Sequence, residues 1–455
     1  MNQTFTYKEK MNQILILLIP ILITQLGMFS MVFFNTILSG KYSSVDLAGV
    51  AIGASIWNPV FTGLSGILLA VSPIVAQHYG EREHKQISSA LAHGIYLAVF
   101  IALTVLIIGF FFLEPLLSMM DLHKGVENVA HDYLIGLSIG IVPLFVFNAL
   151  RSFIYGLGKT RVIMILLLSA LPINFFLNYM FIYGKWIFPE LGGAGGGYAT
   201  AFTYWFVLTM TVFIVLTKEP FSKFVKIASF KAFSVEKCKE ILKIGVPMGL
   251  SIFFETSMFA VVTILISRFD VTTIAAYQSA LNIVSFLYMI PLSMSMALTV
   301  LVGFEVGAKR NKDARAYSWL GVGLSILIAF VTGILVILFR YDVAALYSNE
   351  TAVINMTAHF LIYALFFQIS DAIQATAQSA LRGYKDVNIA FIMTLIAYWF
   401  ICLPIGYGLA HMTSLGAKGY WIGLTIGLLA AGIALSARLM YIQKRRFFHV
   451  DEQAS

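Results

Sequence analysis

Residues 241–266 read ILKIGVPMGLSIFFETSMFAVVTILI, an apolar run with one acid, Glu255, near its middle. As a helix rising about 1.5 Å per residue, the run is about 39 Å long, enough to cross the roughly 30 Å hydrocarbon core of a bilayer. Residues 360–381, FLIYALFFQISDAIQATAQSAL, form a similar run around Asp371. A charge at mid-bilayer costs roughly 2.5–3.5 kcal/mol on insertion scales, so such residues are usually retained for function. The two runs predict a helical membrane protein with two functional acids.

The rest of the chain has the same character. Of its 455 residues, 59% are hydrophobic and 11% are charged, whereas about 25% are charged in soluble proteins. Apolar runs long enough to span a bilayer occur at 13–38, 46–72, 88–112, 133–156, 162–184, 195–217, 241–267, 272–302, 316–339, 357–381, 387–410 and 419–442. We therefore expect an all-α integral membrane fold with twelve transmembrane helices.

Lys and Arg indicate the orientation of these helices. The N-terminus, the even-numbered loops and the C-terminus hold nearly all of them. By the positive-inside rule both termini face the cytoplasm, and we expect a multi-pass protein of the plasma membrane. The net charge of +8 reports this topology, so no nucleic-acid partner is needed to explain it. The basic loops are expected to contact anionic membrane lipids.

The chain also contains an internal repeat. One constant offset aligns Pro20 with Pro247, Gly80 with Gly307 and Gly156 with Gly383, without any gap. Since each half has an even number of spans, the repeats are parallel and related by an axis along the membrane normal. We predict two six-helix lobes, 1–216 and 244–455, the second ending in a short basic cytoplasmic tail. The cytoplasmic linker 217–243 alternates Lys with apolar residues, which suits either a segment lying on the headgroups or a solvated loop.

Glu255 and Asp371 are expected at the same depth in the second lobe. Glu255 lies about 15 residues into a span entered from the cytoplasm, and Asp371 about 14 residues into one entered from outside, which puts both about 21–22 Å deep. Desolvation disfavours a charged carboxyl group, so each acid can hold a proton and release it when water or a cation arrives. Such a pair can exchange H⁺, Na⁺ or an organic cation.

Other polar and aromatic residues surround the two acids in sequence. Phe259 follows Glu255 by one turn and offers either a cation–π contact or ordinary packing. Gln278, Asn282 and Tyr288 belong either to the cation and substrate neighbourhood or to ordinary interhelical hydrogen bonds.

The first lobe lacks a deep acid. Its deep polar residues, which we expect to form an uncharged polar pocket, are Gln25, Asn35, Asn174 and Asn178. Arg151 is the only deep base in this lobe, and we expect it to snorkel to the interface.

Enzyme signatures are absent from the sequence. There is no Walker-type phosphate loop, no cluster of Cys and His with metal-ligand spacing, and no paired His and acid for hydrolysis. We therefore expect no enzyme and no cofactor, with Na⁺ or H⁺ as the coupling ion.

Several strings in order resemble the multidrug and toxic compound extrusion (MATE) transporters, specifically the NorM-like branch. They are LRSFIYGLGKT, INFFLNYMFIYGKWIFPELGG, FFETSMFAVV, AAYQSALN, DAIQATAQSALRGYKD and LGAKGYWIGL. The resemblance covers essentially the whole chain. It implies two six-helix lobes around a V-shaped cleft and cation-driven export of drugs by alternating access.

The resemblance also implies roles for individual residues. The family's cation-site acids correspond to Glu255 and Asp371, which would be the Na⁺ ligands in a sodium-coupled protein, and Phe259 and Tyr288 correspond to residues of the cation neighbourhood. NorM-like proteins commonly carry Asp in the first helix, in a pattern resembling VDTIMAG. This chain reads FFNTILSG, so Asn35 replaces that acid and the expected coupling is concentrated on the second lobe.

We therefore expect a secondary active multidrug transporter, an antiporter that exchanges Na⁺ or H⁺ for amphiphilic organic cations such as drugs and dyes and acts as a monomer. One alternative is a flippase of a lipid-linked precursor on a related fold, but its cavity would need several deep bases for pyrophosphate, whereas this chain offers Arg151 at most. Another is an intramembrane enzyme, which would consume its substrate without moving it.

Overall fold

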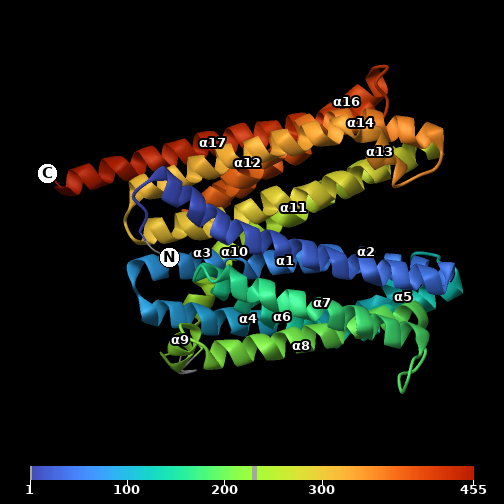
Figure 1. Ribbon diagram of the computed structural model, residues 1–455, viewed down its shortest axis with the longest axis horizontal. Coiled ribbons are helices and arrows are strands. Elements are labelled where there is room, and N and C mark those ends of the chain that lie inside the picture. The colour runs from blue at the N-terminus through green and yellow to red at the C-terminus, as the bar shows by residue number, and fades with distance from the viewer. Residues whose placement is uncertain (1–2, 228–232, 455) are drawn as a thin grey trace. The chain divides into compact units, whose positions relative to one another are not determined.

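The computed structural model describes residues 3–227 and 233–454, and these residues contain helices and no strands (Figure 1). The helices are α1 (Tyr7–Tyr42), α2 (Ser44–Leu68), α3 (Val71–Glu81), α4 (His84–Ser118), α5 (Lys124–Ser138), α6 (Ile141–Gly156), α7 (Thr160–Tyr183), η1 (Gly192–Ala194), α8 (Gly195–Thr217), α9 (Phe221–Ile227), α10 (Val235–Ile266), α11 (Val271–Gly307), α12 (Asn311–Leu338), α13 (Arg340–Ala345), α14 (Thr351–Gly383), α15 (Val387–Leu395), η2 (Ile396–Cys402), α16 (Leu403–Met412) and α17 (Lys418–Ala454).

The helices account for the twelve predicted spans. Eleven segments of the described chain are long and apolar enough to cross a bilayer, and the pair α5 and α6, bent by 52°, makes a twelfth if it is counted as one span. In a bilayer core only helices and closed barrels satisfy the backbone, which is why long apolar runs become helices here. The predicted all-α membrane fold is confirmed.

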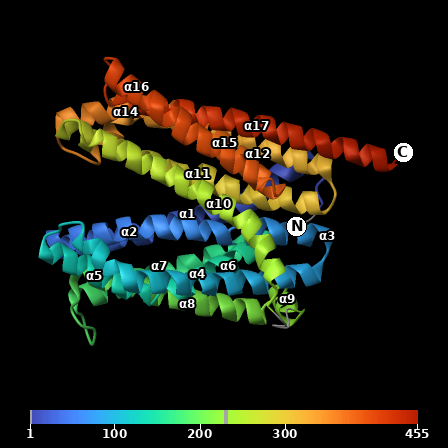
Figure 2. The same cartoon turned by 180° about the vertical axis from the view of Figure 1, so that it is seen from behind.

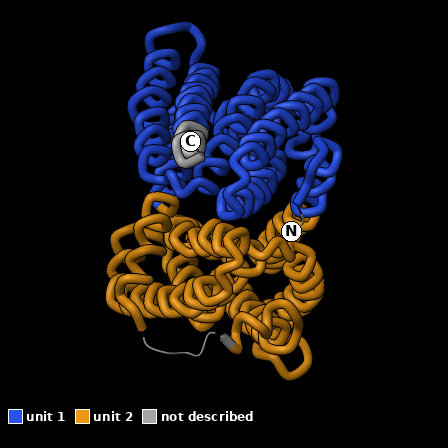
Figure 3. Tube along the Cα trace, turned by 90° about the vertical axis from the view of Figure 1, so that its left-hand side faces the viewer, with its two compact units in different colours: residues 1–19, 250–455 blue, residues 20–249 orange. Residues whose placement is uncertain are grey.

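The chain divides into two compact units, which Figure 3 shows in different colours. One unit is Pro20–Gly249, and the other is Met1–Ile19 with Leu250–Ser455. In the latter, α11, α14 and α17 pack side by side (Figures 1 and 2). The core between them includes the fully buried rings of Tyr277, Phe360 and Trp421.

The internal repeat is visible in the backbone of each unit. The offset that aligns Pro20 with Pro247 also relates the starts of α2 and α11, of α4 and α12, of α5 and α14, and of α7 and α15. Left-handed residues follow the same offset: Arg82 (φ 62°) corresponds to Lys309 (φ 59°), and Gly158 (φ 71°) corresponds to Lys385 (φ 61°). The left-handed backbone conformation costs free energy for any residue other than glycine. Its recurrence at equivalent helix ends therefore reflects one shared architecture.

Close helix packing recurs at equivalent glycines. A Cβ atom added to Gly156 of α6 would lie 2.7 Å from Cβ of Val75 on α3. The equivalent Gly383 of α14 would place its Cβ 2.9 Å from Cβ of Val302 on α11. Small residues permit such close approach of helices in membranes. The two glycines therefore set the same helix contact once in each unit.

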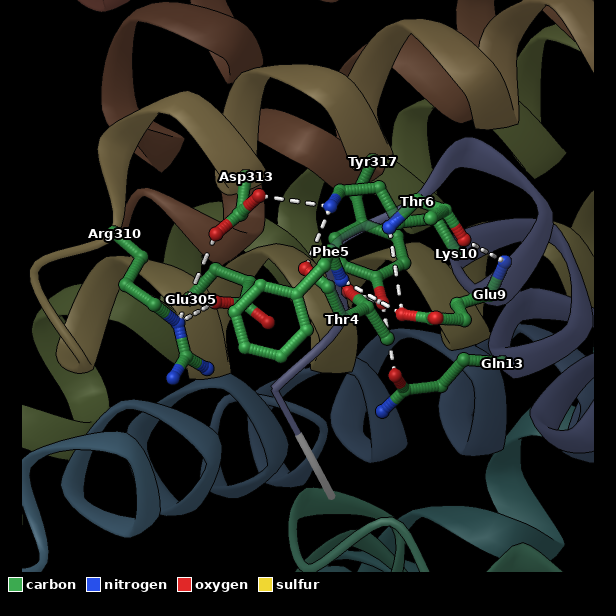
Figure 4. A network of polar contacts seen from close by, with 10 residues as sticks. All are labelled: Thr4, Phe5, Thr6, Glu9, Lys10, Gln13, Glu305, Arg310, Asp313 and Tyr317. Atoms are coloured by element: carbon green, nitrogen blue, oxygen red, sulfur yellow. Dashed lines mark hydrogen bonds and ion pairs between the residues drawn. The ribbon is translucent and has the colours of Figure 1, made fainter.

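A polar network attaches the start of α1 to α12 within one unit (Figure 4). Lys10 Nζ pairs with Asp313 Oδ1 at 2.8 Å and donates to the Thr4 carbonyl at 2.9 Å. The Tyr317 hydroxyl donates to Gln13 Oε1 at 2.8 Å and lies 2.9 Å from Thr4 Oγ1. Lys10 is only 4% exposed, so its charge depends on these partners.

We predict that Gly156→Ala and Gly383→Ala each lower the thermal unfolding midpoint of the detergent-solubilised protein. Overpacking at such contacts costs about 1–3 kcal/mol, because a neighbouring helix must shift. Gly323→Ala is the matched control, since Gly323 is exposed on α12 and an added Cβ meets nothing within 4 Å. Unchanged midpoints for both packed glycines would contradict this account.

We also predict that Asp313→Asn destabilises the protein by about 1.5–3 kcal/mol, the usual value of a hydrogen bond to a charged group. The substitution leaves the buried Lys10 ammonium without its charged partner. Adding Lys10→Met removes that uncompensated charge, so the double variant is expected to be more stable than the sum of the two single effects. Thermal unfolding of the four proteins measures this coupling, and strict additivity would show that the pair contributes nothing.

Candidate functional site

The structure brings the two membrane acids together within one unit. Glu255 lies on α10 and is half-buried, and Asp371 lies on α14 and is 2% exposed. The two are close enough for their charges to repel each other. Among the residues that the structure describes, the buried Oδ2 of Asp371 has no hydrogen-bond partner. Since buried polar atoms are normally hydrogen-bonded, this oxygen marks a position suited to a proton or a cation.

Two tyrosines complete the surroundings of the acids. The Tyr288 hydroxyl of α11 donates a hydrogen bond to Glu255. Tyr398 lies on the π-helix η2, is 1% exposed, and lies within electrostatic range of both acids. Its buried hydroxyl also lacks a hydrogen-bond partner within the described part of the chain. A π-helix turns side chains away from their α-helical directions and often occurs at functional sites, and here it directs Tyr398 toward the acids.

A polar stripe runs from Asp371 along one face of α14. Its members are separated by three, four and four residues and are Asp371, Gln374, Gln378 and Arg382. Gln374 Nε2 donates to Gln378 Oε1 at 3.0 Å, and both side chains are buried. Arg382 stands in the last turn of α14, and its charge attracts that of Glu255. The stripe covers about 16 Å of helix and connects the acid pair to a base.

The sequence analysis missed four of these residues: Gln374, Gln378, Arg382 and Tyr398. The spacing of the α14 stripe was a readable signal, because polar residues three and four apart share a helix face. No pattern in the sequence indicated that Tyr398 lies near the acids, because the π-helical geometry of η2 changes which residues share a helix face.

The other residues that the sequence predicted in the second half are Phe259, Gln278 and Asn282. Phe259 packs against Phe367 with ring centroids 6.0 Å apart, and Phe367 in turn contacts Trp421. Gln278 and Asn282 are exposed on α11, where Asn282 Nδ2 donates to the Gln278 carbonyl at 2.9 Å. The described contacts of these two polar side chains do not include either acid.

Three of the four polar residues predicted in the first half, Asn35, Asn174 and Asn178, lie in contacts that involve α8 or α7, and the fourth, Gln25, lies on α1. Asn174 Nδ2 donates to Thr203 Oγ1 of α8, and Asn178 Nδ2 donates to Asn174 Oδ1, both at 3.1 Å. Asn35 packs against α8 as well, where a Cβ on Gly196 would collide with its Oδ1.

Gln25 lies on α1, and Arg151 lies on α6. In residues 3–227 and 233–454, the buried Oε1 of Gln25 has no hydrogen-bond partner. The expectation that Arg151 snorkels is wrong: the side chain is 5% exposed and contacts α1 through Met28.

A family model described as MatE matches the chain twice, over residues 20–180 and 247–408. The two matches begin at Pro20 and Pro247, the pair of prolines that the internal repeat aligns. The chain is 51% identical over 445 residues to a protein of Bacillus licheniformis named "Probable multidrug resistance protein NorM", with 98% of each chain covered. A protein of Bacillus subtilis with the same name is 50% identical over 445 residues, again covering 98% of each chain.

Solved structures share the fold. The crystal structure of a eukaryotic MATE transporter matches with a TM-score of 0.85 at 20% identity, covering 98% of this chain and 99% of the other. An outward-facing multidrug resistance MATE family transporter matches with a TM-score of 0.88 at 19% identity, covering 95% and 96%. The double match of the family model and the close similarity to full-length relatives show that the chain belongs to the MATE family, in its NorM-like branch.

Proposed function

We propose that this chain, a multidrug efflux transporter, is a secondary antiporter in which Na⁺ or H⁺ binds at Glu255 and Asp371 and drives the export of amphiphilic organic cations. The observation that carries the proposal is the unpaired, buried Oδ2 of Asp371 beside a second carboxyl group. A buried carboxylate without a partner is costly, so the pair is stable only when a proton or a cation neutralises it.

Neutralisation by different cations provides the exchange. Carboxylate and hydroxyl oxygens are the ligands that hard cations prefer, and the carboxyl groups also accept protons. An organic cation competes for the same negative charge, so entry of the small ion displaces the drug. Each ligand then favours the lobe arrangement that it binds more tightly, which is the requirement for alternating access.

Arg382 opposes the binding of any cation at Glu255. Its positive charge attracts that of Glu255 and therefore competes with an entering ion for the carboxyl group. This opposition favours release of the ion once it has driven the cycle. Arg382 thus acts on the ion only through its attraction to Glu255.

The wider setting follows from the family and the charge pattern. The relatives are named for multidrug resistance, and we extend to this chain the export of drugs and dyes that carry a positive charge. The protein works as a monomer in the plasma membrane, with both termini in the cytoplasm and basic loops on anionic lipids. The lobes 1–216 and 244–455, joined by the linker 217–243, are the alternating bodies, and no cofactor other than the coupling ion is used.

Proteoliposomes with an imposed Na⁺ or pH gradient, one at a time, test the coupling site. We expect Glu255→Gln and Asp371→Asn each to reduce gradient-driven dye efflux on the order of tenfold or more, because the neutral amides cannot exchange a cation. The ion whose gradient supports wild-type efflux is the coupling ion. Asp342→Asn, an exposed acid on α13, is the matched control and should retain efflux. Full efflux by both site variants would refute the assignment.

Arg382→Gln tests the opposing charge. Without Arg382 the acid pair should bind its ion more tightly, so the half-saturating ion concentration should fall on the order of tenfold, the effect of one neighbouring charge. Maximal efflux should fall as well, because the ion leaves more slowly. Arg382→Lys keeps the charge and should resemble the wild type. A higher half-saturating concentration in Arg382→Gln would be inconsistent with this role.

A further inference from the structure

Tyr398 lies near the acid pair with a hydroxyl that the described contacts leave unused. The side chain is 1% exposed on the π-helix η2, and within the described chain its buried hydroxyl has no hydrogen-bond partner. Burying a phenol hydroxyl costs free energy unless it donates or accepts a hydrogen bond. An unpaired hydroxyl this deep in one unit therefore points to a partner that is bound in another state of the protein.

The π-helix η2 is held against the turn of α10 that carries Glu255. Trp399 Nε1 donates to the Phe254 carbonyl at 3.3 Å. Cys402 Sγ lies 3.7 Å from Met258 Sδ. Phe254 directly precedes Glu255, and Met258 follows that acid by three residues, on the same side of the helix. The two contacts bracket the acid and fix η2 beside it.

The unpaired groups of Tyr398 and Asp371 are complementary. The phenol hydroxyl is a hydrogen-bond donor, and Oδ2 of Asp371 is a buried acceptor without a partner among the described residues. The two side chains lie within electrostatic range of each other. Glu255 already receives a hydrogen bond from the Tyr288 hydroxyl. The site therefore holds two acids and two phenols, with one donor–acceptor pair formed and the other open.

The half of the chain without the acids also lacks the two phenols. At the offset of the repeat, Glu255, Asp371, Tyr288 and Tyr398 correspond to Met28, Leu144, Phe61 and Leu171. Cδ1 of Leu171 would lie 3.6 Å from a Cβ added to Gly27, the residue before Met28. The stretch of α7 around Leu171 is an uninterrupted α-helix. The position equivalent to Tyr398 thus also lies beside α1, but the hydroxyl and the π-helix occur only where the acids are.

We propose that Tyr398 is a positioning residue of the coupling site, whose hydroxyl donates a hydrogen bond to Oδ2 of Asp371 whenever the coupling ion is absent. The inference rests on the proposed function, because it takes Asp371 as an ion-binding group, and it adds the group that replaces the ion after release. The phenol keeps its proton throughout, so the exchange is between a hydrogen bond and a bound ion.

This hydrogen bond opposes ion binding. A hydrogen bond to the charged form of a carboxyl group stabilises that form, and here the charged form is the empty site. The entering ion must displace the hydroxyl, which lowers its affinity for Asp371 and favours its release. Tyr398 therefore acts on the ion through Asp371, as Arg382 acts through Glu255.

Tyr398→Phe tests the proposal, because it removes the hydroxyl and keeps the ring. Efflux of ethidium from proteoliposomes is measured over a range of Na⁺ gradients and, separately, of pH gradients. The ethidium concentration is held well below its KM, so the dye does not compete with the ion. We expect the half-saturating concentration of the coupling ion to fall about tenfold, the effect of losing one hydrogen bond to a charged group. Tyr398→Leu installs the residue of the first half and should produce the same fall if Tyr398→Phe does not fold.

Two comparisons separate this role from packing. Tyr277→Phe is the matched control, since Tyr277 is buried in the same core but faces Thr263 and Cys402 in place of the acids. Its half-saturating concentration should stay that of the wild type. In the residual efflux of Asp371→Asn, adding Tyr398→Phe should cause no further fall, because the carboxylate is already gone.

Three outcomes would overturn the role of Tyr398. An unchanged half-saturating concentration in folded Tyr398→Phe would show that the hydroxyl does not compete with the ion. A higher concentration would make the hydroxyl a ligand of the ion. An equal fall in Tyr277→Phe, or one that persists beside Asp371→Asn, would assign the effect to packing. Failure of the coupling site appears separately, as full efflux by Glu255→Gln and Asp371→Asn.

Discussion

The free-energy cost of placing a charge away from water constrains every buried ionisable side chain of this protein. Each buried charge must have a partner, exchange one, or be neutralised. The network around Lys10 is of the first kind, because its charge is balanced by Asp313 in a fixed ion pair. In the function proposed above, the pair of Glu255 and Asp371 is of the second kind, because two like charges stand together and Oδ2 of Asp371 has no partner among the described residues. Transport requires the second kind, since a permanently satisfied charge has nothing to exchange.

The two halves share a backbone and differ in their charges. Helix starts, left-handed residues and glycine contacts recur at one constant offset, and the family model matches once in each half. At the offset of the repeat, Glu255 and Asp371 correspond to Met28 and Leu144, and a base, Arg151, is buried on α6 of the first half. The duplicated scaffold therefore carries different buried charges in its two halves.

Much of the fold was predictable from particular stretches of sequence. The helical membrane fold, the internal repeat and a transporter rather than an enzyme were predicted from apolar runs, aligned residues and family-like strings. The eleven to twelve apolar helices, the double family match and the relatives confirm them. The roles of Glu255 and Asp371 stay predictions. Arg151 was misread because its position near a helix end suggested a route to the interface, whereas packing against Met28 closes that route.

The sequence by itself determined the helices, their number and the two acids, because a bilayer forces apolar runs into helices and penalises every charge that they carry. Only the tertiary structure decided which side chains meet those charges. Arg382 reaches the charge of Glu255 from another helix, Tyr398 arrives through a π-helix, and Arg151 is enclosed between α1 and α6. These contacts depend on how helices far apart in sequence pack together. The periodicity of a single helix does not predict that packing.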